Sequence, residues 1–131
     1  MPASGSFTLD KDERVTGRSL VETLFGGGES RSVSYSPLRV VYCLTQRETA
    51  PVRILVSVPK RHFKRAVKRN RVKRQLREAY RKNKHLLAGR MEAMPDKALA
   101  LAFIWMDSQL HDSSEVESRM VSLLTRIGER L

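Results

Sequence analysis

The feature that most restricts how this chain can fold is a cationic segment at its centre. Residues 60–84 contain thirteen lysines and arginines against one acid, Glu78, and carry a formal charge of +12. The remaining residues hold twelve bases and thirteen acids, so the net charge of +11 arises from this one segment. Charges of one sign cannot be buried together without partners, so most of the segment must lie at the surface. A charge excess gathered on one element also indicates a polyanionic partner, most often a nucleic acid.

The same segment contains an apolar stripe at helical spacing. The side chains that share one side of a helical wheel are Val72, Leu76, Ala79, Tyr80 and Asn83. Those that point the other way are Asn70, Arg71, Arg74, Arg77 and Arg81, with Arg69 and Lys73 on the flank between. The spacing predicts an amphipathic helix over 65–84 with its back in a core. A basic helix lying on an anionic membrane is disfavoured, because the core needs this stripe and no Trp or Phe stands on it.

The outward face of this predicted helix favours nucleic acid over a merely solvated surface. Solvated charge runs usually mix signs, because like charges at i and i+4 repel, and here acids are almost absent. Arginine forks match phosphate oxygens bidentately. Asn70 adds no charge, but its carboxamide can donate and accept hydrogen bonds to base edges or riboses.

The rest of the chain predicts a single α+β domain over 7–131, after a flexible terminus at 1–6. Helical spacing at 11–25 stops at three glycines, and alternation at 38–45 and 52–58 predicts two strands in an antiparallel hairpin. The stretch 32–45 is expected to be extended, with a break at Pro37. Residues 98–106 are apolar on both faces, as in a central covered strand, and follow a linker at 89–97. A last helix starts at Ser114, which forms a capping box with Glu117. The result is one sheet with helices packed on it.

Several classes of protein are disfavoured by what the sequence contains. The single cysteine, Cys43, permits no intrachain disulfide and no cysteine cluster for zinc. We recognise no ligand partner at i+3 or i+4 of His62, His85 or His111, and predict neither a metal site nor catalytic residues in the protein. No apolar run is long enough to span a bilayer and no signal core begins the chain, so we expect a cytoplasmic protein without membrane contact.

Residues 66–80, AVKRNRVKRQLREAY, resemble the signature of the bacterial ribonuclease P protein subunit. That family has an Arg-Asn-Arg helix after a strand ending Ser-Val-x-Lys-Lys/Arg, which matches SVPKR at 57–61. The resemblance covers nearly the whole chain. It implies the fold αβββαβα, with one mixed four-stranded sheet and a left-handed βαβ crossover. It further implies a protein, monomeric in its holoenzyme, that assists a catalytic RNA. That RNA and its bound Mg²⁺ cut the 5′ leader from precursor tRNA.

The resemblance also implies two binding surfaces. The residues expected to bind RNA are Lys60, Arg61, Lys64, Arg65, Lys68, Arg69, Asn70, Arg71, Lys73, Arg74, Arg77 and Arg81. The residues expected to form a cleft for the single-stranded leader are Phe25, Val40 and Tyr42, with Arg69 and Asn70 at its edge. Val40 and Tyr42 share a strand face, and the aromatic rings could stack on unpaired bases. The alternative is that both aromatic side chains belong to the core.

Two other functions compete with this interpretation. A ribosomal RNA-binding structural protein could also combine a sheet with a basic helix. A self-sufficient protein nuclease is disfavoured, because no paired carboxylates or histidines suited to metal-assisted hydrolysis are recognised.

Overall fold

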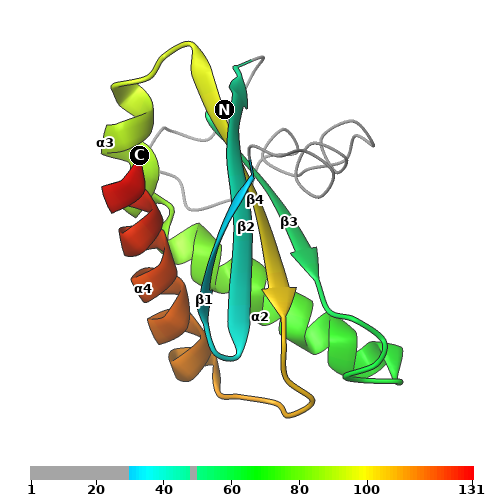
Figure 1. Cartoon of the computed structure of the whole chain (residues 1–131). Coiled ribbons are helices and arrows are strands. Elements are labelled where there is room, and N and C mark those ends of the chain that lie inside the picture. The colour runs from blue at the N-terminus through cyan, green and yellow to red at the C-terminus, as the bar shows by residue number, and fades with distance from the viewer. Residues whose placement is uncertain (1–29, 48–49) are drawn as a thin grey trace, which may run out of the picture.

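A four-stranded mixed sheet with helices packed against it forms the protein (Figure 1), as seen in a computed structural model that describes residues 30–47 and 50–131. The strands are β1 (Arg31–Tyr35), β2 (Leu38–Gln46), β3 (Val52–Ser57) and β4 (Lys97–Trp105). The helices are α2 (Ala66–Asn83), α3 (His85–Glu92) and α4 (Ser113–Arg130). The predicted terminus at 1–6 and the predicted helix at 11–25 lie outside the described residues.

The sheet has the strand order β1-β2-β4-β3. β2 pairs antiparallel with β1 and with β4, whereas β3 pairs parallel with β4. The predicted mixed sheet is therefore confirmed, and so is the central position of the strand that is apolar on both faces. The parallel pair requires a crossover through α2 and α3. Its left-handedness stays a prediction.

The predicted hairpin between the strands at 38–45 and 52–58 is wrong. β2 and β3 are not neighbours, because β4 lies between them and pairs with both. The hairpin that does form joins β1 to β2 around Ser36 and Pro37, whose peptide bond is cis. Alternation shows that a segment is a half-buried strand, but it carries no information on which strand lies beside it.

The helices α2 and α4 cover one face of the sheet with apolar stripes. The buried residues of α2 are Val72, Leu76, Ala79, Tyr80 and Asn83, which is the set predicted from the spacing. Those of α4 include Val116, Met120, Leu123, Leu124 and Ile127, also as predicted. They join the side chains on one face of β2, β3 and β4 in a single core cluster. The back of the basic helix is thus fixed by burial, which determines the direction of its cationic face.

A short helix, α3, replaces part of the predicted linker at 89–97. Leu87 and Met91, one turn apart, are its buried residues. Arg47 at the end of β2 donates from Nη2 to the carbonyls of Met91 and Met94, at 2.9 and 3.2 Å, and from Nε to Lys97 at 2.9 Å. This guanidinium satisfies carbonyls at the negative end of α3, which stabilises a helix that is too short to be stable alone.

The capping box predicted at Ser114 and Glu117 does not form. The helix α4 begins one residue earlier, its N-cap is Asp112, and no side chain caps it. Glu117 instead accepts a hydrogen bond from Asn83 Nδ2 of α2, at 3.1 Å. The glutamate therefore joins two helices and does not close the end of its own helix.

Candidate nucleic-acid interface

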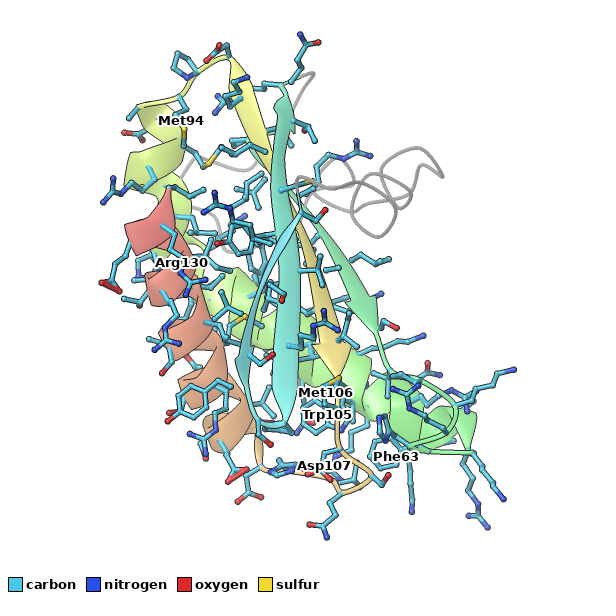
Figure 2. All side chains as sticks on the ribbon, viewed as in Figure 1. Phe63, Met94, Trp105, Met106, Asp107 and Arg130 are labelled. Atoms are coloured by element: carbon cyan, nitrogen blue, oxygen red, sulfur yellow. The ribbon has the colours of Figure 1, made fainter. Side chains whose placement is uncertain are left out.

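The cationic face of α2 points away from the sheet and into solvent. Asn70, Arg71 and Arg74 are exposed on it, and Lys68 is exposed beside them near the start of the helix. Val67, in the first turn of the same helix and one turn before Arg71, is 78% exposed. Figure 2 shows nitrogen-tipped side chains fanning out around the start of this helix. The opposite side of the same helix is buried, so the helix presents its charges on a firm support.

The predicted RNA-binding residues divide into two groups by exposure. The exposed group consists of Lys60, Arg61, Lys64, Arg65, Lys68, Asn70, Arg71 and Arg74. The half-buried group consists of Arg69, Lys73, Arg77 and Arg81. In the second group, Arg81 forms an ion pair with Glu78, the one acid in the segment, through Nε and Oε2 at 3.0 Å. Their hydrogen bond raises the pKa of Arg81 and lowers that of Glu78. This ion pair neutralises one of the positive charges that the surface would otherwise present to a ligand.

The beginning of α2 is suited to an anion. Its N-cap, Arg65, makes no side-chain cap, and the first turn contains no acid. The first backbone N–H groups of a helix lack intrahelical acceptors, and the helix dipole places partial positive charge there. An acidic residue or a capping side chain is favoured at such a position. Here Lys64 and Lys68 add further positive charge, and a phosphate would relieve the repulsion.

Polar side chains fix the helix α2 at its middle and at its C-terminal end. Gln75 Nε2 donates to the carbonyl of His111 at 2.9 Å and to Ser113 Oγ at 3.2 Å. Asn83 Nδ2 donates to the carbonyl of Ala79 at 2.8 Å as well as to Glu117. These bonds join α2 to the segment just before α4 and to the first turns of that helix. The cationic face is therefore carried on a preorganised element, which reduces the ordering cost of binding.

The leader cleft predicted around Val40 and Tyr42 requires a correction. Both side chains are buried in the core cluster, with exposed fractions of 0% and 4%. They do share a strand face, but that face is the one that packs against the helices. Of the predicted cleft residues, Phe25 lies outside the described residues, Asn70 is exposed and Arg69 is half-buried. Tyr42 is thus a core residue, as the alternative interpretation of the aromatics held.

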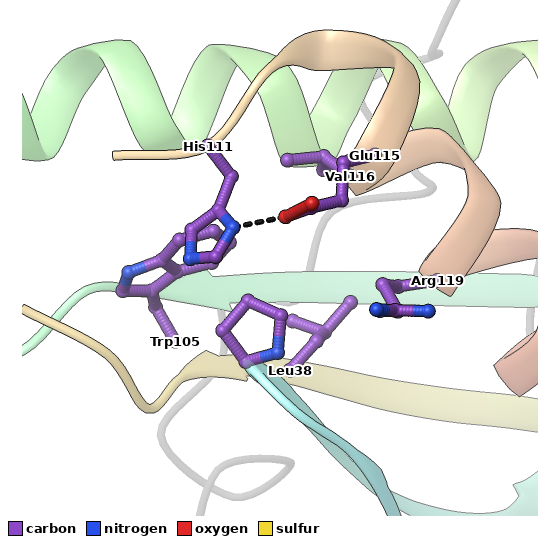
Figure 3. Close-up of a pocket in the computed structure, with 7 residues that line it drawn as sticks. Leu38, Trp105, His111, Glu115, Val116 and Arg119 are labelled. Carbon is purple, nitrogen blue, oxygen red and sulfur yellow. Dashed lines mark hydrogen bonds and ion pairs between the residues drawn. The ribbon is translucent and has the colours of Figure 1, made fainter. Parts of the chain in front are cut away.

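A cluster around His111 was missed in the sequence. His111 Nε2 lies 2.7 Å from Asp107 Oδ2. His111 Nδ1 is bonded to Glu115, as Figure 3 shows. Both carboxylates stand four residues from the histidine, so the statement that it lacks partners at that spacing was wrong. The ring meets Trp105 edge-on, with centroids 5.4 Å apart. The cluster fastens the loop before α4 and supports the backbone carbonyl that Gln75 binds.

This cluster predicts a pH-dependent stability. The hydrogen bond to Asp107 raises the pKa of His111 above 6.5, with a further contribution from Glu115, and the same bond lowers the pKa of Asp107. A raised pKa stabilises the folded state fully below about pH 6.5, and this contribution is lost as pH rises through the folded value. We expect the free energy of unfolding of the wild type to fall over that window. In His111→Gln the fall should vanish in parallel denaturant titrations, and an unchanged pH profile would contradict the assignment.

Two searches of the structure concern other kinds of site. Among residues 30–47 and 50–131, no group of three or more His, Cys, Asp and Glu side chains is arranged to hold a metal ion. In the same part of the chain, no helix has the length and apolar character needed to cross a membrane.

Comparison with known proteins identifies the family. The sequence model of the family named Ribonuclease P matches residues 9–128. The chain belongs to the ribonuclease P protein family. It is 44% identical over 129 residues to the ribonuclease P protein component of Porphyromonas gingivalis, covering 98% of this chain and 92% of that one. The component from Chlorobaculum tepidum is 37% identical over 105 residues, which is 74% of this chain and 66% of the other. Membership of the ribonuclease P family implies a part in the 5′ processing of tRNA.

Solved structures show the same fold. The ribonuclease P protein from Thermotoga maritima superposes with a TM-score of 0.67 at 23% identity, covering 87% of this chain and 96% of that chain. The protein from Staphylococcus aureus gives 0.65 at 20% identity, with 93% of each chain covered. The basic helix and mixed sheet are therefore arranged as in ribonuclease P proteins.

Proposed function

We propose that this chain is the protein subunit of a ribonuclease P ribonucleoprotein. In this role it binds the catalytic RNA and the 5′ leader of precursor tRNA, and so promotes endonucleolytic maturation of the tRNA 5′ end. The observation that carries the proposal is the cationic face of α2, which the buried stripe Val72–Leu76–Tyr80 holds outward. The proposal extends the family assignment to named surfaces of this chain.

The catalytic RNA binds to the exposed cations of α2 and of the loop before it. Exposed arginines such as Arg71 and Arg74 form paired hydrogen bonds to phosphate oxygens, and release of counterions makes the affinity depend steeply on salt. Because the backbone of α2 is fixed and its cationic side chains are exposed, this surface is suited to recognising an RNA by its shape.

The leader meets the protein beside Asn70. This side chain is exposed among the cations, and its carboxamide can donate to and accept from a base edge or a ribose hydroxyl. Stacking on Tyr42 is not part of the proposal, because that ring is buried.

The chemistry of strand cleavage belongs to the RNA. The proposed protein surface consists of lysine and arginine side chains, which carry positive charge at neutral pH and repel Mg²⁺. The Mg²⁺ required for cleavage is therefore bound mainly by the RNA. The protein contributes by neutralising phosphates that would otherwise repel one another, so that the folded RNA and its substrate associate at lower Mg²⁺.

Reconstitution of activity tests the proposal. We expect the protein mixed with ribonuclease P RNA to cleave precursor tRNA at a low Mg²⁺ concentration at which neither component is active alone. The cut should release the intact 5′ leader, as judged by gel mobility against a leader of known length. Binding of the RNA without any gain in cleavage would instead indicate a structural RNA-binding protein. Cleavage by the protein alone would indicate a protein nuclease.

A further inference from the structure

The loop at 60–65 carries four exposed cations but contains no helix or strand. Lys60, Arg61, Lys64 and Arg65 all lie at the surface, while Phe63 between them is 5% exposed and belongs to the core cluster. Figure 2 places Phe63 at the end of the sheet where Trp105 also lies. Four like charges in six residues repel one another. Such a loop needs hydrogen bonds to the rest of the protein if its cations are to keep a defined arrangement.

Arg69, in the first turn of α2, supplies hydrogen bonds of this kind. Its Nη1 donates to the carbonyl of Phe63 and to the carbonyl of Lys64, each at 2.8 Å. One terminal nitrogen of the guanidinium therefore uses both of its hydrogens on the loop backbone. The side chain is half-buried, unlike its neighbours Lys68 and Asn70.

Two longer hydrogen bonds hold the first half of the loop. The backbone N–H of His62 donates to the carbonyl of Pro59 at 3.1 Å, and His62 Nδ1 is hydrogen-bonded to Ser108 Oγ at 3.1 Å. Neither bond reaches the stretch between Phe63 and α2. In the described structure, Arg69 is thus the side chain that ties Phe63 and Lys64 to the helix.

We propose that Arg69 is a positioning residue for RNA binding. It holds the loop at 60–65 so that Lys64 and Arg65 present their charges together with the outward face of α2. The inference rests on the proposed function and deepens it, because it assigns Arg69 a role that its charge alone does not provide. A guanidinium fixes two carbonyls with a planar set of donors, whereas a lysine keeps the charge on a flexible stem with a strongly hydrated ammonium.

Charge-conserving variants separate positioning from direct phosphate contact. We expect Arg69→Lys to weaken binding of ribonuclease P RNA by about 20-fold at 0.15 M salt, the value for two lost phosphate contacts, although no charge is removed. The comparison variant is Arg71→Lys on the exposed face, which exchanges one forked phosphate contact for a point charge and should lose less than the value of one contact, about 5-fold. In log–log plots against salt, each lost contact should reduce the slope by about 0.7 to 0.9.

A double-mutant cycle gives the second readout. Lys64→Ala and Arg65→Ala should each weaken RNA binding in the wild type, but much less in the Arg69→Lys background, because the loop is already displaced. In the Arg71→Ala background their effects should add. Additive effects in both backgrounds, or an Arg69→Lys protein that binds as tightly as wild type, would overturn the proposal.

Backbone NMR order parameters of the free wild-type protein keep the proposal testable if the Arg69 variants fold poorly. The loop from Phe63 to Arg65 should be as ordered as α2 before any RNA is added, and low order parameters there would refute a preset loop. The control with Arg71→Ala distinguishes this inference from the proposed function. If Arg71→Ala leaves the salt slope unchanged, the RNA-binding face itself is misassigned. If Arg71→Ala reduces the slope but Arg69→Lys does not, the positioning role alone is wrong.

Discussion

Replacing Lys68, Arg71 and Arg74 together by alanine is expected to weaken binding of ribonuclease P RNA by about 100-fold at 0.15 M salt. The estimate assigns one phosphate contact to each side chain, so the salt slope should fall by roughly 2 to 2.7 in total. All three are exposed, and Arg71 and Arg74 lie on the side of α2 that faces away from the buried stripe. Their removal should leave the unfolding midpoint nearly unchanged, because surface substitutions of this kind cost little and relieve repulsion.

A matched triple variant controls for loss of charge alone. Arg90, Arg126 and Arg130 are exposed on α3 and α4, and their replacement by alanine removes the same formal charge from other elements. This variant should keep the salt slope of the wild type, with a small loss of affinity from the weaker long-range field. Equal losses in the two triple variants would show that net charge, not the face of α2, determines RNA binding.

The orientation of α2 was predictable because a helix has one period and one buried side. Val72, Leu76 and Tyr80 repeat every four residues, and no other rotation of the helix would bury them together. The direction of the cationic face follows from the same helical period. The local sequence was therefore enough to place Arg71 and Arg74 in solvent, whereas Arg77 and Arg81, predicted on the same side, are half-buried.

The neighbours of each strand were not predictable in the same way. The alternation in β2 and β3 is equally compatible with a direct pairing or with a third strand between them. The deciding residues lie in β4, 47 positions beyond their partners in β3 and 51 to 67 positions beyond their partners in β2. Strand order depends on such distant contacts, and so does the choice of which face of β2 receives the helices.

Distant contacts also explain the missed helix and the missed cluster. α3 depends on Arg47, which is more than forty residues away and donates to its last carbonyls. For Asp107, His111 and Glu115, the spacing of four residues was visible in the sequence, but Asp107 and His111 precede α4 and lie in a loop. Helical spacing indicates neighbours only where a helix is expected, so the signal was available and was not recognised.

Tyr42→Ala is expected to be the most destabilising of the substitutions considered, at about 3 to 5 kcal/mol, the usual cost of truncating a large buried aromatic. Its ring packs in the core cluster with residues of α2 and α4, so the loss should loosen the support of the basic helix. Affinity for precursor tRNA with a leader and for tRNA without one should then fall by the same factor on reconstituted holoenzyme. The measurement combines a denaturant unfolding curve with the two binding titrations at fixed salt.

Tyr42→Phe is the matched control, because it keeps the ring and removes a hydroxyl that is buried without a hydrogen-bond partner in the described structure. That change should be neutral or slightly stabilising, since an unsatisfied buried hydroxyl costs free energy. If Tyr42→Ala left the unfolding curve unchanged and weakened only the tRNA that carries a leader, the ring would have to be accessible to RNA. The sheet would then have to open between β2 and the helices during binding, and the leader site would include the face that is buried in the free protein.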